Sequence, residues 1–272
     1  MRTRQEIKAI GRERFKANYW ACVLAAVLVA IVIVVLQVLA SGPAMQAAGS
    51  GQDVDFQEIA AASGASSVGS SIGSLLLFLL TGPLTVGLNY FYIVNVLGRD
   101  DEISVVTPFR SAFSRFGRKL GGYLWMELFL FLWSLLGMVG FALEAVAMMT
   151  ENRIMLLIGI ALMIAGFIPA IVKTYSYAMT PYFLADCSAV RATDALKLSK
   201  RVMSGHKWEF FVMQLSFLGW ILLSVLTLGL LDLFYVGPYM SSSFATYYLE
   251  VREEGLRTGT ITMGQLEGKE AV

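Results

Sequence analysis

The sequence contains few of the residues that enzyme sites and covalent frameworks use most. Among 272 residues there are two cysteines, Cys22 and Cys187, and one histidine, His206. Two separated cysteines provide neither a disulfide framework nor a CxxC metal site. The HExxH zinc motif, the phosphate-binding P-loop and the GxGxxG nucleotide fingerprint do not occur. We therefore expect no catalytic residue, no metal and no cofactor.

Charged residues are also scarce. Asp, Glu, Lys and Arg make up 15% of the chain, whereas the AVILMFWYC residues make up 57%. Soluble domains contain about 25% charged residues, so this composition is that of an integral membrane protein. Lys plus Arg total 21 and Asp plus Glu total 20. Because the basic residues lie in short stretches beside apolar runs, we expect the lipid bilayer as partner and no nucleic acid.

Long apolar runs are what the sequence has in abundance. A helix needs about 20 mostly apolar residues to cross a bilayer. We predict an all-α integral membrane protein with six transmembrane helices arranged as three hairpins. The six runs are Tyr19–Leu39, Ile72–Leu97, Tyr123–Met148, Ile154–Ala185, Phe210–Leu228 and Leu230–Leu249. A very short turn around Gly229 joins the last two, and a single crossing with a re-entrant end is the alternative there.

The positions of the basic residues predict the orientation. Lys and Arg occur six times before the first run, five times in 99–119 and five times in 191–207. Between these stretches, 41–71 has none and the turn after the third run has only Arg153. Cytoplasmic loops carry the excess of Lys and Arg. We therefore predict a plasma-membrane protein with both termini in the cytoplasm.

Each predicted hairpin is preceded by a short basic amphipathic helix. Thr3 and Glu6 form a possible capping box, Thr107-Pro108 is typical of a helix start, and 192–203 repeats small or apolar residues at helical spacing. Asp186 or Ser188 could cap the third of these helices. Such helices lie in the interface with their basic side toward headgroups. The expected headgroup contacts are Arg191, Lys200, Arg201 and Lys207, and the expected interfacial anchors are Trp20, Trp125 and Trp208.

The return helix of each hairpin contains a proline followed by tyrosines. Pro83, Pro169 and Pro238 are the expected kinks, and Pro169 should bend or divide the long fourth run. We interpret the three hairpins as internal repeats, although positive-inside bias and aromatic belts alone would also create this likeness. The domain boundaries follow: hairpins at about 1–97, 98–186 and 187–250 in one transmembrane domain, then a polar cytoplasmic tail, 251–272, with partial disorder.

Ionisable residues within the apolar runs are the best indication of a site, because a charge in hydrocarbon costs at least about 2.5 kcal/mol. Lys173 lies just after Pro169. One interpretation is a polar cavity at the kinked helices. Its candidate residues are Lys173, Glu127, Asn89, Tyr90, Tyr177 and Ser242. The alternative is that Lys173 reaches the interface or forms one structural ion pair.

Several segments resemble a known family. The segments "GFIPAIVKTYSYAMTPYFLAD", "ALKLSKRVMSGHKWEFF" and "GPYMSSSFATYY" resemble the C-terminal half of domain-of-unknown-function family 975, and "RERFKANYW" and "TGPLTVGLNYFYIVNVLGRD" resemble its N-terminal half. The resemblance covers about residues 1–250. It implies a bacterial plasma-membrane protein and brings no established activity. Residues 139–166 look inserted relative to the family.

Three functions remain open. The first is a membrane component without enzymatic activity in envelope maintenance or assembly. The second is a small-solute or lipid transporter, or its accessory, and the third and weakest is a membrane-embedded enzyme. "GSSIG" around Ser71 matches G-x-S-x-G but lacks a preceding strand, so helix packing through Gly69 and Gly73 explains it better. The loop 41–70, with acidic residues and no basic one, should be flexible and extracytoplasmic.

Overall fold

The computed structural model describes residues 2–41, 56–270 and 272, with side chains described outside 41 and 56–71. All regular elements within these ranges are helices. The predicted flexible loop, 41–70, lies entirely outside the residues with described side chains. Its second part is helical rather than a loop, because the α4 backbone begins at Phe56.

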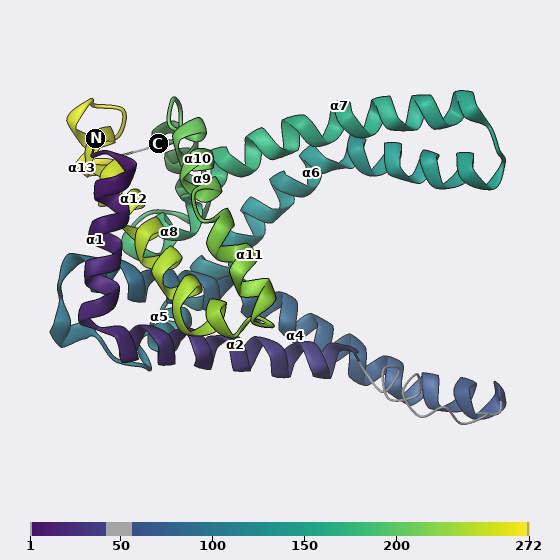
Figure 1. Ribbon diagram of the computed structural model, residues 1–272, viewed down its shortest axis with the longest axis horizontal. Coiled ribbons are helices and arrows are strands. Elements are labelled where there is room, and N and C mark those ends of the chain that lie inside the picture. Colours follow the sequence, from purple (N-terminus) through teal and green to yellow (C-terminus); the bar gives the residue numbers. More distant parts are fainter. Residues whose placement is uncertain (1, 42–55, 271) are drawn as a thin grey trace.

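Two long helical hairpins dominate the shape. α2 (Tyr19–Ser41) packs against α4 (Phe56–Leu97), and α6 (Phe116–Met149) packs against α7 (Arg153–Tyr177). In Figure 1 they extend as two arms from a common body. Their outer surfaces expose large apolar side chains, among them Val34, Phe78, Phe141, Ile154 and Leu157. Side chains of this kind on the outside of a helix are suited to contact with lipid.

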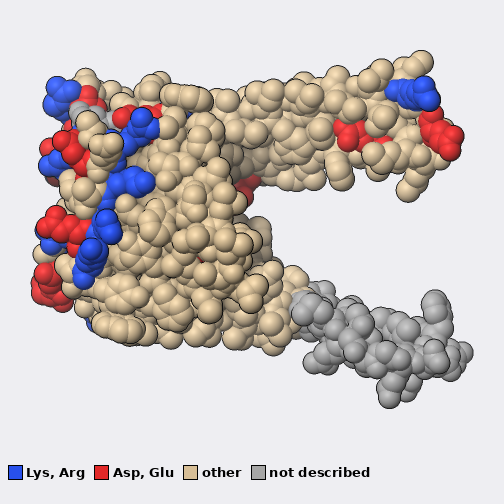
Figure 2. Space-filling view, viewed as in Figure 1, with Lys and Arg blue, Asp and Glu red and all other residues tan. Residues whose placement is uncertain are grey.

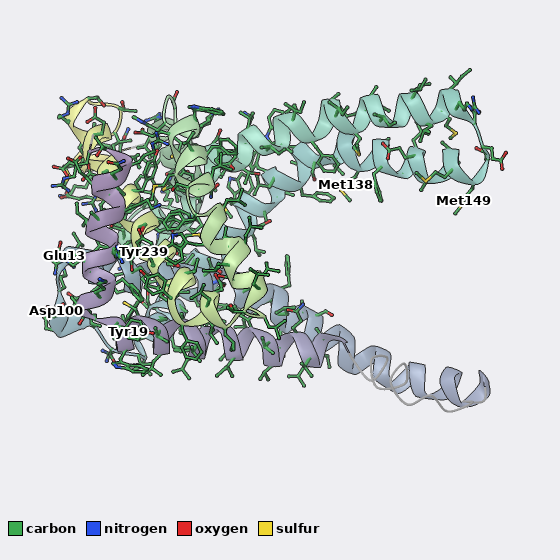
Figure 3. The ribbon with its side chains drawn as sticks, in the orientation of Figure 1. Glu13, Tyr19, Asp100, Met138, Met149 and Tyr239 are labelled. Atoms are coloured by element: carbon green, nitrogen blue, oxygen red, sulfur yellow. The ribbon has the colours of Figure 1, made fainter. Side chains whose placement is uncertain are left out.

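The body consists of shorter helices around a buried aromatic core. These are α1 (Arg4–Ala17), η1 (Asp100–Glu102), α5 (Thr107–Phe113), α8 (Thr180–Asp186), α9 (Ala192–Val202), α12 (Gly237–Arg257) and α13 (Met263–Leu266). The largest fully buried side chains include Phe15, Phe91, Tyr92, Phe183, Tyr247 and Tyr248. Charged side chains gather on the outer end of this body, and the arms are mostly uncharged except near the α6–α7 turn (Figure 2). In Figure 3, Glu13 and Asp100 lie at the charged end, and Met138 and Met149 lie along the α6–α7 arm.

The three short amphipathic helices form where the sequence predicts them. Thr3 and Glu6 make the expected capping box at the start of α1, and α5 has Pro108 in its first turn. α9 buries Ala195, Leu196 and other residues of its small and apolar face against the protein. The predicted cap was wrong, because Arg191 occupies the N-cap of α9 and gives no side-chain hydrogen bond.

The long fourth run is divided, but not at Pro169. α7 continues through Pro169 to Tyr177, and α8 begins at Thr180. Ser199 of α9 connects the two ends, because its hydroxyl accepts from the Met179 amide at 3.1 Å and donates to the Ser176 carbonyl at 2.9 Å. The hydroxyl thus satisfies backbone groups that the interrupted helix leaves without partners.

The predicted sixth crossing, Leu230–Leu249, is not confirmed. Within the described residues, five helical runs are long and apolar enough to cross a membrane, and the fifth is Lys207–Leu226. That run contains α10 (Lys207–Leu215) and α11 (Leu218–Leu226) and is followed by a π-helix, η2 (Asp232–Val236). α12 then packs against α1 and α4 with polar and aromatic side chains buried. Pro238 stands in the first turn of α12 rather than inside a crossing.

The segment after Glu250 has helical structure where the sequence predicts a polar, partly disordered tail. α12 continues to Arg257, and the short α13 begins with a capping box between Thr262 and Gln265. Ile261 and Leu266 are buried in the main core. These two apolar side chains attach residues 258–270 to the body. The average composition of the tail is polar, so it does not predict this contact.

Candidate functional site

The structure places three of the predicted cavity residues on α6 and α7 and three on α4 and α12, and none of the described cavities is lined by more than one of the six. The Lys173 ammonium lies over the Trp133 ring, 4.4 Å from its centroid, within the α6–α7 arm. Glu127 interacts with Tyr123, one turn earlier on α6. Tyr177 is buried in a small apolar cluster with Met126. Lys173 therefore makes a structural contact with an aromatic ring, and no ion pair joins it to a described residue.

The other three residues of the predicted cavity are also separate. The Tyr90 hydroxyl donates to Glu102 Oε2 at 3.0 Å, and Asn89 is half-buried on α4. Ser242 is buried in α12, and its hydroxyl has no hydrogen-bond partner within the described part of the chain. Of the four cavities described for the protein, only one is lined by a residue of this set, Tyr90.

The predicted surface contacts lie on the outside, as their proposed role requires. Arg191, Lys200 and Arg201 are exposed, and Lys207 is half-buried. Trp20 and Trp208 are strongly exposed near the first turns of α2 and α10, and Trp125 less so on α6. These positions permit contact with headgroups, which stays a prediction.

The cavity that contains Tyr90 is a basic pocket between α4, α5, the start of α6 and the end of α8. Its volume is about 310 Å³. The residues that define this basic pocket are Tyr90, Thr107, Arg110, Ser111, Ser114, Arg115, Arg118, Lys119, Ala185, Asp186 and Ser188. Four of them are cationic and one is acidic. A pocket with this charge would attract an anion.

Backbone carbonyls hold the cations of the basic pocket in place. Arg118 donates to the carbonyls of Leu184 at 2.6 Å, Val190 at 2.9 Å and Cys187 at 3.1 Å. The Lys119 side chain is only 4% exposed, and its ammonium donates to the carbonyl and, at 2.9 Å, to the hydroxyl of Ser111. None of these acceptors carries a charge. The cations are therefore positioned without being neutralised.

The acid of the basic pocket is already paired. Asp186 Oδ2 accepts from Arg252 and, at 2.8 Å, from the Tyr248 hydroxyl. Burial lowers the pKa of Arg252, but the Asp186 carboxylate reverses this effect and raises it overall. Burial also raises the pKa of the adjacent Cys187 thiol to about 12, so this thiol stays protonated and unreactive. Arg252, from α12, thus neutralises Asp186, the one acidic residue that lines the basic pocket.

Sequence reasoning missed the basic pocket as a unit. The five basic residues in 99–119 predicted a cytoplasmic stretch, and this cluster was the available signal. The cluster could not indicate that the end of α8 would form the opposite wall of the basic pocket. His206 lies elsewhere, with Nδ1 3.3 Å from Glu209 Oε2. Within the described residues, no group of three His, Cys, Asp or Glu side chains is placed to hold a metal.

Gly73 of the "GSSIG" segment lies at the contact between α2 and α4. A Cβ at this position would be 2.5 Å from the Leu39 carbonyl oxygen. Such close backbone approach agrees with the helix-packing interpretation. The side chain of Ser71 lies outside the described residues.

Comparison with known families decides the classification. The family described as "Protein of unknown function (DUF975)" matches residues 1–255. The chain belongs to this family. No curated protein and no solved structure gives a significant match. The DUF975 match covers both arms and nearly all of α12, and it includes the basic pocket.

Proposed function

We propose that this chain is a multipass component of the plasma membrane that serves envelope maintenance or assembly and is not an enzyme. The observation that supports it is the distribution of charge on the described surface: charged side chains gather at one end of the body, and the described parts of the arms carry few apart from those toward the α6–α7 turn (Figure 2). The arms provide contact with lipid on the outside of α2, α4, α6 and α7. The charged end provides the surface for headgroups and partner proteins. The candidate polar residues are dispersed, which argues against a transport path through them.

Both termini belong to the charged end in this proposal. The Arg2 guanidinium pairs with Glu250 at 2.7 Å, and α1 packs along α12. Basic residues concentrate in the same end, so we place it in the cytoplasm. Termini on one side of a membrane require an even number of crossings, whereas five runs among the described residues are long enough to cross.

We resolve this by proposing that α10 and α11 enter the membrane and return without crossing. The turn after α11 is apolar at its tip: Leu226 is 80% and Leu228 is 94% exposed. By contrast, the α6–α7 turn carries Glu151 and Arg153. An apolar tip favours hydrocarbon, and a charged tip favours water. The chain would then cross four times, in its two arms.

The backbone of the α11–η2 turn fits this placement. The amides of Thr227, Leu228 and Gly229 donate to carbonyls in the last turn of α11, the Leu230 amide donates to the Thr227 carbonyl, and the Leu231 amide donates to the Thr227 hydroxyl at 3.1 Å. A backbone in hydrocarbon must satisfy its polar groups internally. The amide groups of this turn would therefore not need water.

Cysteine accessibility tests this topology. We expect Glu151→Cys to react with a membrane-impermeant maleimide added outside intact cells, and Leu226→Cys to react only after detergent is added. The native Cys22 and Cys187 are both buried, which gives a low background. If Leu226→Cys reacts from outside as fast as Glu151→Cys, the third hairpin crosses and the six-crossing arrangement is restored.

The proposed role predicts no transport. Liposomes containing the purified protein should move small solutes and fluorescent phospholipids no faster than protein-free liposomes do. Lys173→Ala and Glu127→Ala should leave this result unchanged, because these residues contact Trp133 and Tyr123 rather than a shared cavity. Flux that disappears in Lys173→Ala at unchanged membrane insertion would replace this proposal with the transporter.

A further inference from the structure

We propose that the basic pocket binds the phosphate of an anionic phospholipid headgroup. This inference deepens the proposed function and rests on the charged end facing the cytoplasmic leaflet. It assigns a specific ligand site to the protein, distinct from the exposed basic residues of α9.

The charge of the basic pocket is the first support. Arg110, Arg115, Arg118 and Lys119 form no ion pair with any described residue, and Asp186 is held by Arg252. Removing an ammonium such as that of Lys119 from water is costly unless an opposite charge compensates it. An anion in the pocket would supply that charge. Basic pockets at the cytoplasmic ends of membrane helices bind phosphate headgroups for this reason.

The donors are already positioned. Three carbonyls fix the Arg118 guanidinium, and its Nε–H is buried without an acceptor in the described part of the chain. Buried donors of this kind normally have a partner. A phosphate oxygen would provide one. Arg110 and Arg115 are exposed at the same pocket. One Arg115 nitrogen donates to the Ser188 carbonyl at 2.5 Å, and its other N–H groups can approach a bound anion from outside, as those of Arg110 can.

The surroundings favour a lipid over free phosphate. α5 and the residue before it expose Val106 (63%) and Phe113 (58%), and Phe113 stacks on Phe116 with 6.0 Å between ring centroids. Apolar side chains beside a basic pocket suit a ligand with a charged head and acyl chains. The cavity of about 310 Å³ lies at the small end of ligand pockets, which suits a headgroup rather than a whole lipid.

Native mass spectrometry of the full-length protein in detergent tests the proposal. Phosphatidylglycerol and phosphatidylcholine would be titrated separately into wild type and Arg110→Gln/Arg115→Gln. The matched control is Lys200→Gln/Arg201→Gln, which removes the same charge from exposed positions on α9. Both pairs of substitutions lie on the surface, and Arg115→Gln removes in addition one hydrogen bond to the Ser188 carbonyl, so the fold should persist with at most a small loss of stability. Melting temperature reports this directly.

We expect wild type to prefer phosphatidylglycerol, and Arg110→Gln/Arg115→Gln to weaken that binding about tenfold or more, since each basic residue adds about 1 kcal/mol near an anionic lipid. The α9 control should retain nearly full binding. Equal losses in both variants would indicate general surface attraction and overturn the site. Displacement of the lipid by millimolar inorganic phosphate would also overturn the lipid assignment, because the pocket would then take the free anion.

Failure of this site and failure of the proposed function can be distinguished. Lipid flux in liposomes together with specific phosphatidylglycerol binding would reject the non-transport role and keep the site. No flux together with equal binding of both lipids would reject the site and keep the role. The maleimide assay reports separately whether the arms cross as proposed.

Discussion

Gly166→Leu should force the α6–α7 arm apart. A Cβ at Gly166 would lie 2.1 Å from the Gly137 amide nitrogen and 2.6 Å from its Cα. Both are backbone atoms, so no side chain can rotate away to relieve the contact. Overpacking of this kind typically lowers the free energy of unfolding by about 1–3 kcal/mol. We expect a large loss of melting temperature in detergent and reduced abundance in the membrane.

Gly219→Leu is the matched control. Gly219 is also helical, on α11, and a Cβ there would meet nothing within 4 Å. Replacing an exposed helical glycine gains up to about 1 kcal/mol of helix propensity. The control should therefore melt at or slightly above the wild-type temperature. If both variants lose stability equally, the close contact between α6 and α7 is not what holds the arm together.

The same contact recurs farther along the arm. A Cβ at Gly140 would lie 2.3 Å from the Met163 amide nitrogen, and one at Gly159 would lie 3.0 Å from the Gly140 carbonyl oxygen. Small residues on facing helices allow such close backbone approach in membranes. The stretch 139–166 thus forms the outer part of a glycine-packed hairpin.

Local signals explain what the sequence predicted well. The first five apolar runs are marked by length and composition, and the capping box at Thr3 and Glu6 lies within four residues of chain. Each depends on neighbours in sequence. The membrane class and the three amphipathic helices could therefore be predicted before any tertiary contact was known.

Contacts between distant segments explain what was missed. Lys173 is an isolated charge in sequence, and only folding brings it to Trp133 on the preceding helix. α12 packs against other helices of the body, so its surface does not face lipid and can include polar side chains. Composition alone does not predict this packing. Asp186 was a plausible cap for α9, but its partner Arg252 lies 66 residues away. The basic pocket needs that pairing, and no local pattern predicts it.

Arg252→Met should destabilise the body more strongly than the loss of any exposed ion pair. It would leave the Asp186 carboxylate with two uncharged donors, the Tyr248 hydroxyl at 2.8 Å and the Cys187 thiol at 3.8 Å. Breaking a buried pair costs about 3–5 kcal/mol, and we expect the lower end because the two side chains retain 16% and 27% exposure. Arg257→Met is the control. The Arg257 side chain is exposed and pairs with Glu254, so its loss should cost at most about 1 kcal/mol of stability.

The double variant Asp186→Asn/Arg252→Met separates stability from charge. It removes both charges together, so it should recover part of the lost stability, and the basic pocket should bind phosphatidylglycerol as wild type does. Arg252→Met alone restores an unpaired carboxylate to the pocket wall and should weaken that binding. Melting curves and lipid titrations on wild type, Asp186→Asn, Arg252→Met and the double variant give both cycles. If Arg252→Met melts like Arg257→Met and binds lipid normally, Arg252 neither supports the body nor neutralises the pocket.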